Sequence, residues 1–230
     1  MRRDSLRKML LSALALGAVP GTAQAEMVLS KVIVDLQPEQ RSSEDIEVWN
    51  DGADTLYVAA EPYQILEPGT VAQHREPARD PGASGILVSP QRLILEPGQR
   101  RIVRVAAVLP KTARDRVWRV TVKPVAGPLS SAGDALKLYV GYDVLVLQRP
   151  AVVTGEIGAT RSGQTLRLSN RTNTAWEVFD GRQCDAAGAN CKSLPATRLY
   201  AGAEWEVALP YATAVEYKVT NGRKTQIRRF

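Results

Sequence analysis

The stretch from Ala135 to Pro150, ALKLYVGYDVLVLQRP, constrains the fold of this chain more than any other segment. At the two-residue period of a β-strand, one face collects Leu136, Leu138, Val140, Tyr142, Val144 and Val146. A strand-like run of about 12 residues is roughly twice the usual strand length. The run ends at Arg149-Pro150, because proline cannot continue a central strand. We therefore expect the last strand of one domain, placed at a domain boundary and carrying more apolar surface than its own core needs.

The first 25 residues have the three parts of an export signal. A basic segment precedes the apolar run Met9 to Val19, which is too short to span a membrane stably. Ala23-Gln24-Ala25 then matches a cleavage site of small residues. We predict a signal peptide over residues 1–25, removed near Ala25, and a periplasmic product without stable membrane insertion. The general secretory route is favoured, while Arg2-Arg3 also fits a twin-arginine signal.

Removal of this leader changes the charge balance of the chain. The leader contains Arg2, Arg3, Arg7 and Lys8 and a single acid, Asp4. The net charge therefore falls from +6 for the whole sequence to about +3 for the mature protein. A charge this small does not favour nucleic acid as a partner.

The two cysteines, Cys184 and Cys191, are expected to form a structural disulfide in an oxidising compartment. Closing so short a loop would stabilise the fold by about 2–3 kcal/mol in the loop-entropy picture. A metal site is not favoured, because the sequence has one histidine and no second cysteine pair. We predict no metal and no other cofactor.

Short alternating segments separated by turn residues run through the rest of the chain. In the first half we predict strands over residues 28–36, 43–49, 55–60, 86–88, 92–95, 101–108 and 115–122, followed by the long strand. In the second half we predict strands over residues 152–157, 165–169, 175–179, 204–209, 215–220 and 224–227. The segment from Glu61 to Ser84 contains four prolines and is predicted to be a surface excursion. The pattern indicates an all-β fold of two sandwiches, over residues 26–149 and 150–230.

No arrangement of residues in the sequence indicates catalysis. A Ser-His-acid site would have to use His74, which has no recognisable nucleophile motif beside it. No glycine-rich phosphate loop occurs either. We predict that the chain is not an enzyme, and the alternative, a hydrolase on a β-sandwich scaffold, would require a pocket organised around His74.

Several segments follow one another in a characteristic order. Gly85 to Val105, GILVSPQRLILEPGQRRIVRV, joins an apolar strand, Ser-Pro, a second strand, a Pro-Gly turn and an arginine-containing strand. Asp115 to Val120 starts with an acid and carries an aromatic residue, and Leu136 to Pro150 ends in Arg-Pro. The second half adds Leu166 to Asn170, Thr174 and Leu199 to Gly202. Together these segments, which span essentially the whole mature chain, resemble the periplasmic pilus-assembly chaperones of the chaperone–usher pathway, the PapD-like family.

This resemblance implies two immunoglobulin-like β-sandwich domains arranged as an L or boomerang. It implies a chaperone that caps incomplete pilus or surface-fibre subunits by donor-strand complementation and delivers them to an outer-membrane usher. The donor residues implied for this chain are Leu136, Leu138, Val140 and Tyr142. Burial of three aliphatic side chains would contribute about 5–9 kcal/mol before association costs. The free protein is expected to be a monomer or a weak self-capping dimer.

The sequence departs from the family at the site that holds the subunit's C-terminal carboxylate. The resemblance implies two cations, one on the first strand and one on the donor strand, but Leu145 stands where the second is expected. Lys31, Arg104 and Arg119 are the candidates for this anchor, because each lies on a predicted strand. Solvated charges on strand faces are an equally good interpretation of Arg104 and Arg119.

The resemblance also implies an interdomain salt bridge. Asp115 and Arg149 match two of its members, while Asn221-Gly222 replaces the third, an acid near the C-terminus. We therefore expect an ion pair of Asp115 and Arg149 in place of a network of three residues. The alternative function that the sequence leaves open is an exported two-domain adhesin or fibre component, which would itself need a donated strand.

Overall fold

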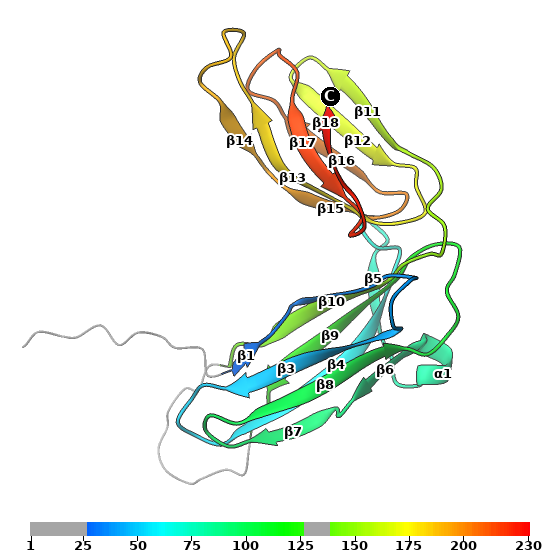
Figure 1. The fold of residues 1–230 in the computed structure, drawn as a ribbon, viewed down its shortest axis with the longest axis vertical. Coiled ribbons are helices and arrows are strands. Elements are labelled where there is room, and N and C mark those ends of the chain that lie inside the picture. The colour runs from blue at the N-terminus through cyan, green and yellow to red at the C-terminus, as the bar shows by residue number, and fades with distance from the viewer. Residues whose placement is uncertain (1–26, 127–138) are drawn as a thin grey trace, which may run out of the picture.

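The computed structural model describes residues 27–126 and 139–230, and within them the protein is almost entirely β. Figure 1 shows two β-sandwiches, one above the other, joined by the segment that follows strand β10 (Tyr142–Gln148). Among the described residues, no strand pairing connects a sheet of one sandwich to a sheet of the other. The prediction of an all-β chain with two sandwiches is confirmed. No helix in these two ranges is long and apolar enough to cross a membrane.

The N-terminal sandwich consists of two sheets around one core. One sheet has the order β1-β3-β8-β6, and the other has the order β2-β10-β9-β4-β5, with β7 also beside β4. The strands are β1 (Met27–Leu29), β2 (Ile33–Leu36), β3 (Ser43–Asn50), β4 (Leu56–Leu66), β5 (His74–Pro77), β6 (Ile86–Ser89), β7 (Arg92–Leu95), β8 (Arg100–Ala107) and β9 (Arg116–Pro124). Alternate residues of most of these strands face the core, although β5 is exposed throughout. Trp118 is fully buried in this core and donates from Nε1 to the Ser84 carbonyl oxygen at 3.0 Å.

The first predicted strand, over residues 28–36, is two strands in the structure. β1 pairs antiparallel with β3, and the chain then crosses to the other sheet, where β2 runs parallel to β10. The sequence pattern does not show this crossover, because both halves are apolar. As a result, the first strand covers only part of the edge of β10.

The segment from Glu61 to Ser84 is exposed over residues 71–77, as a surface excursion would be, but the prediction missed that most of the segment is regular. β4 continues to Leu66 and forms a hairpin with β5, and the short helix α1 (Pro81–Ser84) follows. Pro62 does not interrupt β4, because β7 pairs with residues 56–59 and β5 with residues 63–66. The proline lies between these two partners, where its missing N–H is not required.

The C-terminal sandwich has sheets of order β11-β12-β16 and β14-β13-β17-β18, with β15 also beside β13. Its strands are β11 (Ile157–Ser162), β12 (Thr165–Asn170), β13 (Trp176–Gln183), β14 (Lys192–Leu194), β15 (Thr197–Leu199), β16 (Glu204–Ala208), β17 (Glu216–Thr220) and β18 (Thr225–Arg229). The strand predicted over residues 152–157 is wrong, because the chain becomes a strand only at Ile157. Gly155 has a positive φ of 80°, and a Cβ there would lie 2.2 Å from the Arg171 carbonyl oxygen. The apolar residues before Ile157 therefore belong to a connection.

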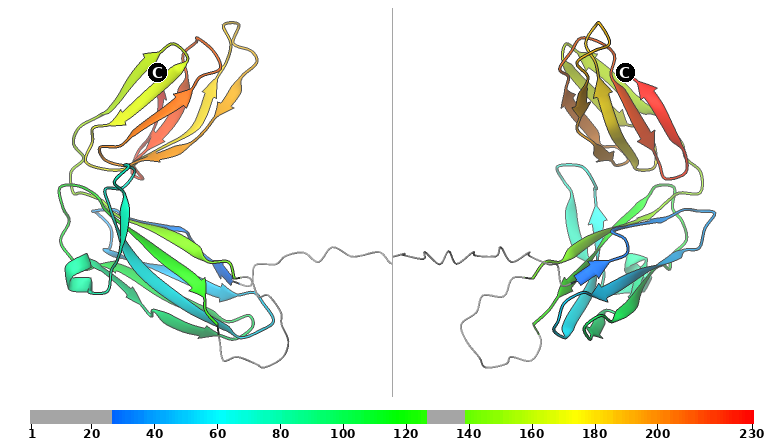
Figure 2. Two further views of the ribbon diagram at one scale, coloured as in Figure 1. Left: turned by 180° about the vertical axis from the view of Figure 1, so that it is seen from behind. Right: turned by 60° about the vertical axis from the view of Figure 1, so that its left-hand side comes forward.

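The two sandwiches touch at points that are distant in the sequence (Figure 2). At the tip of the β4–β5 hairpin, a Cβ on Gly69 would lie 3.0 Å from Cδ2 of Tyr200. In the turn between β17 and β18, a Cβ on Gly222 would lie 2.4 Å from Oδ2 of Asp35. Both glycines have a positive φ, which other residues adopt at a cost. Glycine therefore allows both turns to approach the other sandwich closely.

Candidate functional site

Strand β10 is covered on both edges over only part of its length. β9 pairs with it antiparallel from Tyr142 to Gln148, whereas β2 pairs with it only from Leu145 onward. Among the residues that the structure describes, none pairs with the second edge of residues 142–144. An unpaired strand edge presents main-chain donors and acceptors that can accept another strand. We refer to this edge, from Tyr142 to Val144, as the open edge.

The predicted donor residues lie on and before the open edge. Leu136 and Leu138 lie outside the described residues. Val140 is 71% exposed. Tyr142 packs against the N-terminal core, and its hydroxyl donates to the Met27 carbonyl oxygen at 2.9 Å. Of these four residues, Val140 is the one that the structure shows as an exposed apolar side chain.

Arg119, one of the anchor candidates, reaches the open edge from the neighbouring strand β9. Its Cα is opposite Leu145, and its Nη1 donates to the Asp143 carbonyl oxygen at 3.0 Å. The N–H of Leu145 donates to Val32 and so points toward β2, and the main-chain groups of Asp143, two residues earlier, point to the same side. The guanidinium of Arg119 therefore lies at the open edge, close to where β2 begins.

A second arginine approaches Asp143 from the far edge of the same sheet. Arg75 of β5 donates from Nη2 to Asp143 Oδ1 at 2.7 Å and to Thr121 Oγ1 at 2.7 Å. Its guanidinium also lies 4.2 Å from the ring centroid of Tyr63, within the range of a cation–π contact. Nε of Arg119 lies 3.8 Å from Asp143 Oδ2. Two guanidinium groups thus flank one carboxylate, which leaves an excess positive charge that suits a second carboxylate.

The other two anchor candidates lie elsewhere. Lys31 lies between β1 and β2, and its Nζ contacts Glu44 at 2.6 Å. Arg104 lies on β8, in the other sheet, where its guanidinium binds both carboxylate oxygens of Asp45 at 2.7 and 2.8 Å. This bidentate hydrogen bond lowers the pKa of Asp45. The structure therefore does not bring Lys31, Arg104 and Arg119 together into one site.

Leu145 lies in a small apolar cluster between the two sandwiches. It is 3% exposed and groups with Val117 and Leu147, against which Ile65 and Tyr200 also pack. A charged side chain at this position would lose its hydration. Leucine at the place where the resemblance implies a lysine is therefore part of the contact between the sandwiches.

Arg149, one residue beyond β10, is the centre of a polar network between the sandwiches. It is 3% exposed, and its guanidinium binds both oxygens of Asp35 at 2.7 and 3.0 Å. Its Nη1 also lies 3.2 Å from Asp115 Oδ2 and donates to Thr174 Oγ1 and to the Ala175 carbonyl oxygen. The predicted pair of Asp115 and Arg149 is thus accompanied by a third charged residue, Asp35.

Burial raises the pKa of Asp115, although Arg149, the Ala175 N–H and the Thr174 hydroxyl all favour the ionised form. Burial also disfavours the charge on Arg149, but the hydrogen bond to Asp35 and the negative charges of Asp115 and Asp35 outweigh it, so that its pKa is raised. A buried ion pair needs such additional hydrogen bonds to offset desolvation.

Asp35 and Arg75 were not identified from the sequence. Asp35 is an acid within the otherwise apolar run Val32 to Leu36, and this interruption was the signal available for it. No local pattern in the sequence singles out Arg75, because it lies within the predicted surface excursion from Glu61 to Ser84.

Two further predictions concern cysteine and histidine. The Cys184–Cys191 disulfide is present, as predicted. His74 begins β5, its Nδ1 contacts the Ala72 carbonyl oxygen at 3.0 Å, and its Nε2 lies 3.6 Å from Glu76. In the described ranges, no group of three or more histidine, cysteine, aspartate or glutamate residues is arranged to hold a metal ion.

No protein-family model and no curated protein matches this sequence. Solved structures do match it, and the three described here are 16% to 20% identical to this chain. The class 5 fimbriae chaperone CfaA is 18% identical with a TM-score of 0.63, and the match covers 88% of this chain and 98% of that chain. The E. coli chaperone DraB is 20% identical with a TM-score of 0.61, over 89% and 96% of the two chains.

A chain from the complex of the Salmonella enterica SafA pilin with the SafB chaperone is 16% identical, with a TM-score of 0.65. That match covers 91% of this chain and 97% of the other. These matches extend over both sandwiches. The chain therefore has the fold of the fimbrial chaperones.

Proposed function

We propose that this protein is a periplasmic chaperone of the chaperone–usher pathway, which caps incomplete pilus or fimbrial subunits and delivers them to an outer-membrane usher. The observation that carries this proposal is the open edge of β10 beside the exposed Val140. The proposal includes a signal peptide over residues 1–25, a chaperone domain over residues 26–149 and a second immunoglobulin-like domain over residues 150–230. It includes no catalytic activity and no cofactor.

The subunit would bind by donor-strand complementation. The main-chain groups of Asp143, which face the open side, would pair with an edge strand of the subunit, with the carbonyl oxygen giving up its bond from Arg119. Leu136, Leu138 and Val140 would fill the apolar groove of the subunit. At the end of the open edge, Arg119 and Arg75 would receive the subunit's C-terminal carboxylate. The occurrence of chains of this fold in complexes with a pilin and with tip adhesins supports subunits as partners.

The alternative, an adhesin or fibre component, is less well supported. A fibre subunit would lack a strand and expose its own core groove. Here β10 and β2 close the N-terminal sandwich, and its core residues are buried. The protein should therefore be stable alone in periplasmic extracts, whereas a fibre component should be found at the cell surface.

The role of the open edge is tested by co-expressing the chain with a fibre subunit encoded nearby. Val140→Glu and Leu138→Glu should reduce soluble, co-purifying subunit at least tenfold, because a carboxylate cannot enter an apolar groove without losing its hydration. Val152→Glu is the matched control, because Val152 is 69% exposed but lies beyond β10. Unchanged capture of the subunit by both test variants would contradict the donor-strand mechanism.

The carboxylate anchor is tested in the same assay. Arg119→Ala should weaken subunit capture about tenfold or more, the usual loss when one partner of a charge-assisted hydrogen bond is removed. Arg104→Ala removes an arginine from the other sheet, with a side chain 64% exposed against 33% for Arg119, and should have little effect. If both variants reduced subunit capture equally, Arg119 would not be part of the carboxylate anchor. A subunit lacking its C-terminal carboxylate should bind wild type and Arg119→Ala alike.

A further inference from the structure

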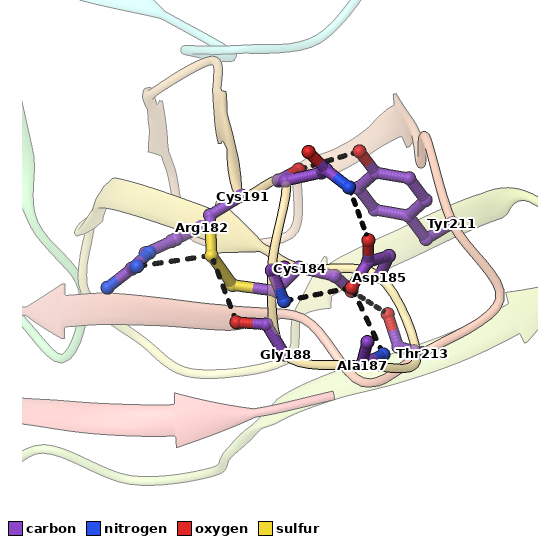
Figure 3. Close-up of a disulfide and its surroundings, with 10 residues drawn as sticks. Arg182, Cys184, Asp185, Ala187, Gly188, Cys191, Tyr211 and Thr213 are labelled. Carbon is purple, nitrogen blue, oxygen red and sulfur yellow. Dashed lines mark hydrogen bonds between the residues drawn. A yellow bond between two sulfur atoms is a disulfide. The ribbon is translucent and has the colours of Figure 1, made fainter.

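The hairpin that carries the disulfide is at the end of the C-terminal sandwich remote from the N-terminal one (Figures 1 and 3). Cys184 directly follows β13 and Cys191 directly precedes β14, so the disulfide closes the base of the loop. Both cysteines are partly exposed. This disulfide is therefore accessible to reagents, unlike one buried in a sandwich core.

The two sulfur atoms have different electrostatic surroundings. Nη2 of Arg182 lies 3.1 Å from Sγ of Cys191, the contact drawn in Figure 3. The neighbouring carboxylates already have partners: Glu216 binds Arg229 at 3.1 Å and Asp180 binds Lys218 at 2.9 Å. Asp185 accepts hydrogen bonds from Ala187, Ala189 and Asn190 within the loop. The positive charge of Arg182 thus remains directed at Cys191, with Lys192 as a second cation next to it in the chain.

The loop is held in shape by contacts that do not involve sulfur. Asp185 binds three loop groups at 2.7 to 3.1 Å, as described above. Tyr211 donates from its hydroxyl to the Asn190 carbonyl oxygen at 2.6 Å, and Thr213 donates to the Cys184 carbonyl oxygen at 2.5 Å. These bonds fix the residues adjacent to both cysteines. The reduced loop is therefore expected to keep the two thiols close together.

Each cysteine also borders its own cleft. Cys184 lines one of about 530 Å³ with Asp185, Thr213 and Arg229, and Cys191 lines one of about 410 Å³ with Lys192 and Ser193. Arg182 borders both clefts. A reagent can therefore approach Cys191 from a side where Arg182 and Lys192 supply positive charge.

We propose that Cys191 is the reactive cysteine of this hairpin and exchanges with a disulfide-bearing oxidant, while Cys184 resolves the intermediate. In the reduced loop, the Cys191 thiolate attacks one sulfur of the oxidant's disulfide, and the oxidant's other sulfur leaves as a thiolate. Cys184, having lost its proton to solvent, then attacks the Cys191 sulfur and expels the second oxidant thiolate. The two cysteines lose two electrons, and the oxidant becomes a dithiol. Arg182 acts by stabilising the Cys191 thiolate.

The test compares the two thiols in the full-length mature protein. Cys184→Ser leaves Cys191 alone, and Cys191→Ser leaves Cys184 alone. The pH dependence of alkylation by iodoacetamide should give Cys191 a pKa below the ordinary thiol value of about 8.5, with alkylation at pH 7 roughly five- to tenfold faster than for Cys184. Arg182→Gln should abolish most of this difference, and Arg182→Lys should restore it in part.

Mixed-disulfide formation supplies a second measurement that does not depend on the single-cysteine variants. Reduced wild type is exposed briefly to glutathione disulfide, quenched with acid and mapped by mass spectrometry, and glutathione should be found on Cys191. An oxidised protein dithiol used at the same concentration shows whether a protein or a small molecule is the better oxidant. Equal reactivity of the two cysteines, faster reaction at Cys184, or no effect of Arg182→Gln would overturn the proposal. None of these results bears on the binding of pilus subunits.

Discussion

Tyr217 illustrates how a single buried side chain sets a pH limit on the C-terminal sandwich. It is fully buried in that core, and its hydroxyl donates to the Pro195 carbonyl oxygen at 3.2 Å. A Cβ on Gly181 would lie 2.2 Å from its ring, so glycine is required opposite it. Burial raises the pKa of Tyr217 from 10.0 to about 12.

This shift predicts a loss of stability in alkali. The unfolded chain ionises Tyr217 near pH 10, and the folded chain does so only near pH 12. The stability that the neutral Tyr217 hydroxyl contributes is therefore fully present below pH 10 and is lost as the pH rises through 12, by about 2–3 kcal/mol. Urea unfolding followed at several pH values should show this slope. Tyr217→Phe should flatten it, whereas Tyr57→Phe, in the other sandwich, should leave it in place.

At the scale of elements, Leu145 of β10 occupies a buried apolar position that a lysine would destabilise. Leu145→Lys would place the cation that the resemblance implies into the apolar cluster with Val117 and Leu147. We expect a loss of about 1–3 kcal/mol in the free energy of unfolding, because the ammonium group must be partly dehydrated. Ile33→Lys is the matched control, since Ile33 is the β2 residue opposite Leu145 and is 43% exposed. Equal stability of the two variants in denaturant titrations would refute this account.

Elements with a strong local pattern were predictable from the sequence, and those decided by distant contacts were not. β7, predicted over residues 92–95, has those bounds in the structure, because alternating residues stand between clear turn signals. The crossover between β1 and β2 depends on which sheet each apolar segment joins, which is a long-range property. The prediction ends β4 at Ala60, because four prolines follow in the segment from Glu61 to Ser84, but Pro62 lies between two partner strands and is compatible with this strand.

The same distinction applies to the candidate site. Asp115 and Arg149 could be named because they flank recognisable segments of the chain. Asp35 and Arg75 come close to their partners only through the arrangement of the sheet, with 114 residues separating Asp35 from Arg149 and 68 separating Arg75 from Asp143. Local sequence patterns carry no information about such distant pairs.

At the scale of the whole molecule, the turn at Gly222 packs against the N-terminal sandwich and so helps to hold the two sandwiches together. Gly222→Ala should lower the free energy of unfolding by about 1–3 kcal/mol and loosen the interdomain contact, because its φ is +86° and the new Cβ would meet Asp35 and Gln37. Gly188→Ala is the control, with a φ of +73° and nothing within 4 Å of the Cβ. The loss of stability in Gly188→Ala therefore measures the cost of placing alanine at a positive φ, without a steric contact. Small-angle scattering should show a broader distribution of shapes for Gly222→Ala alone.

The open edge of β10 also has a mechanical consequence. A strand placed there would be bonded to β10 through the main-chain groups of Asp143, because those of Tyr142 and Val144 face β9, and β2 occupies the edge beyond it. Few main-chain hydrogen bonds would therefore hold such a strand at this edge, each worth about 0.5–1.5 kcal/mol. A pull along the strand axis would instead be carried by β10 and its seven pairings with β9 to Arg149 and the C-terminal sandwich. We therefore expect a strand bound at the open edge to be displaced more easily by a competing strand than by a pull along its axis.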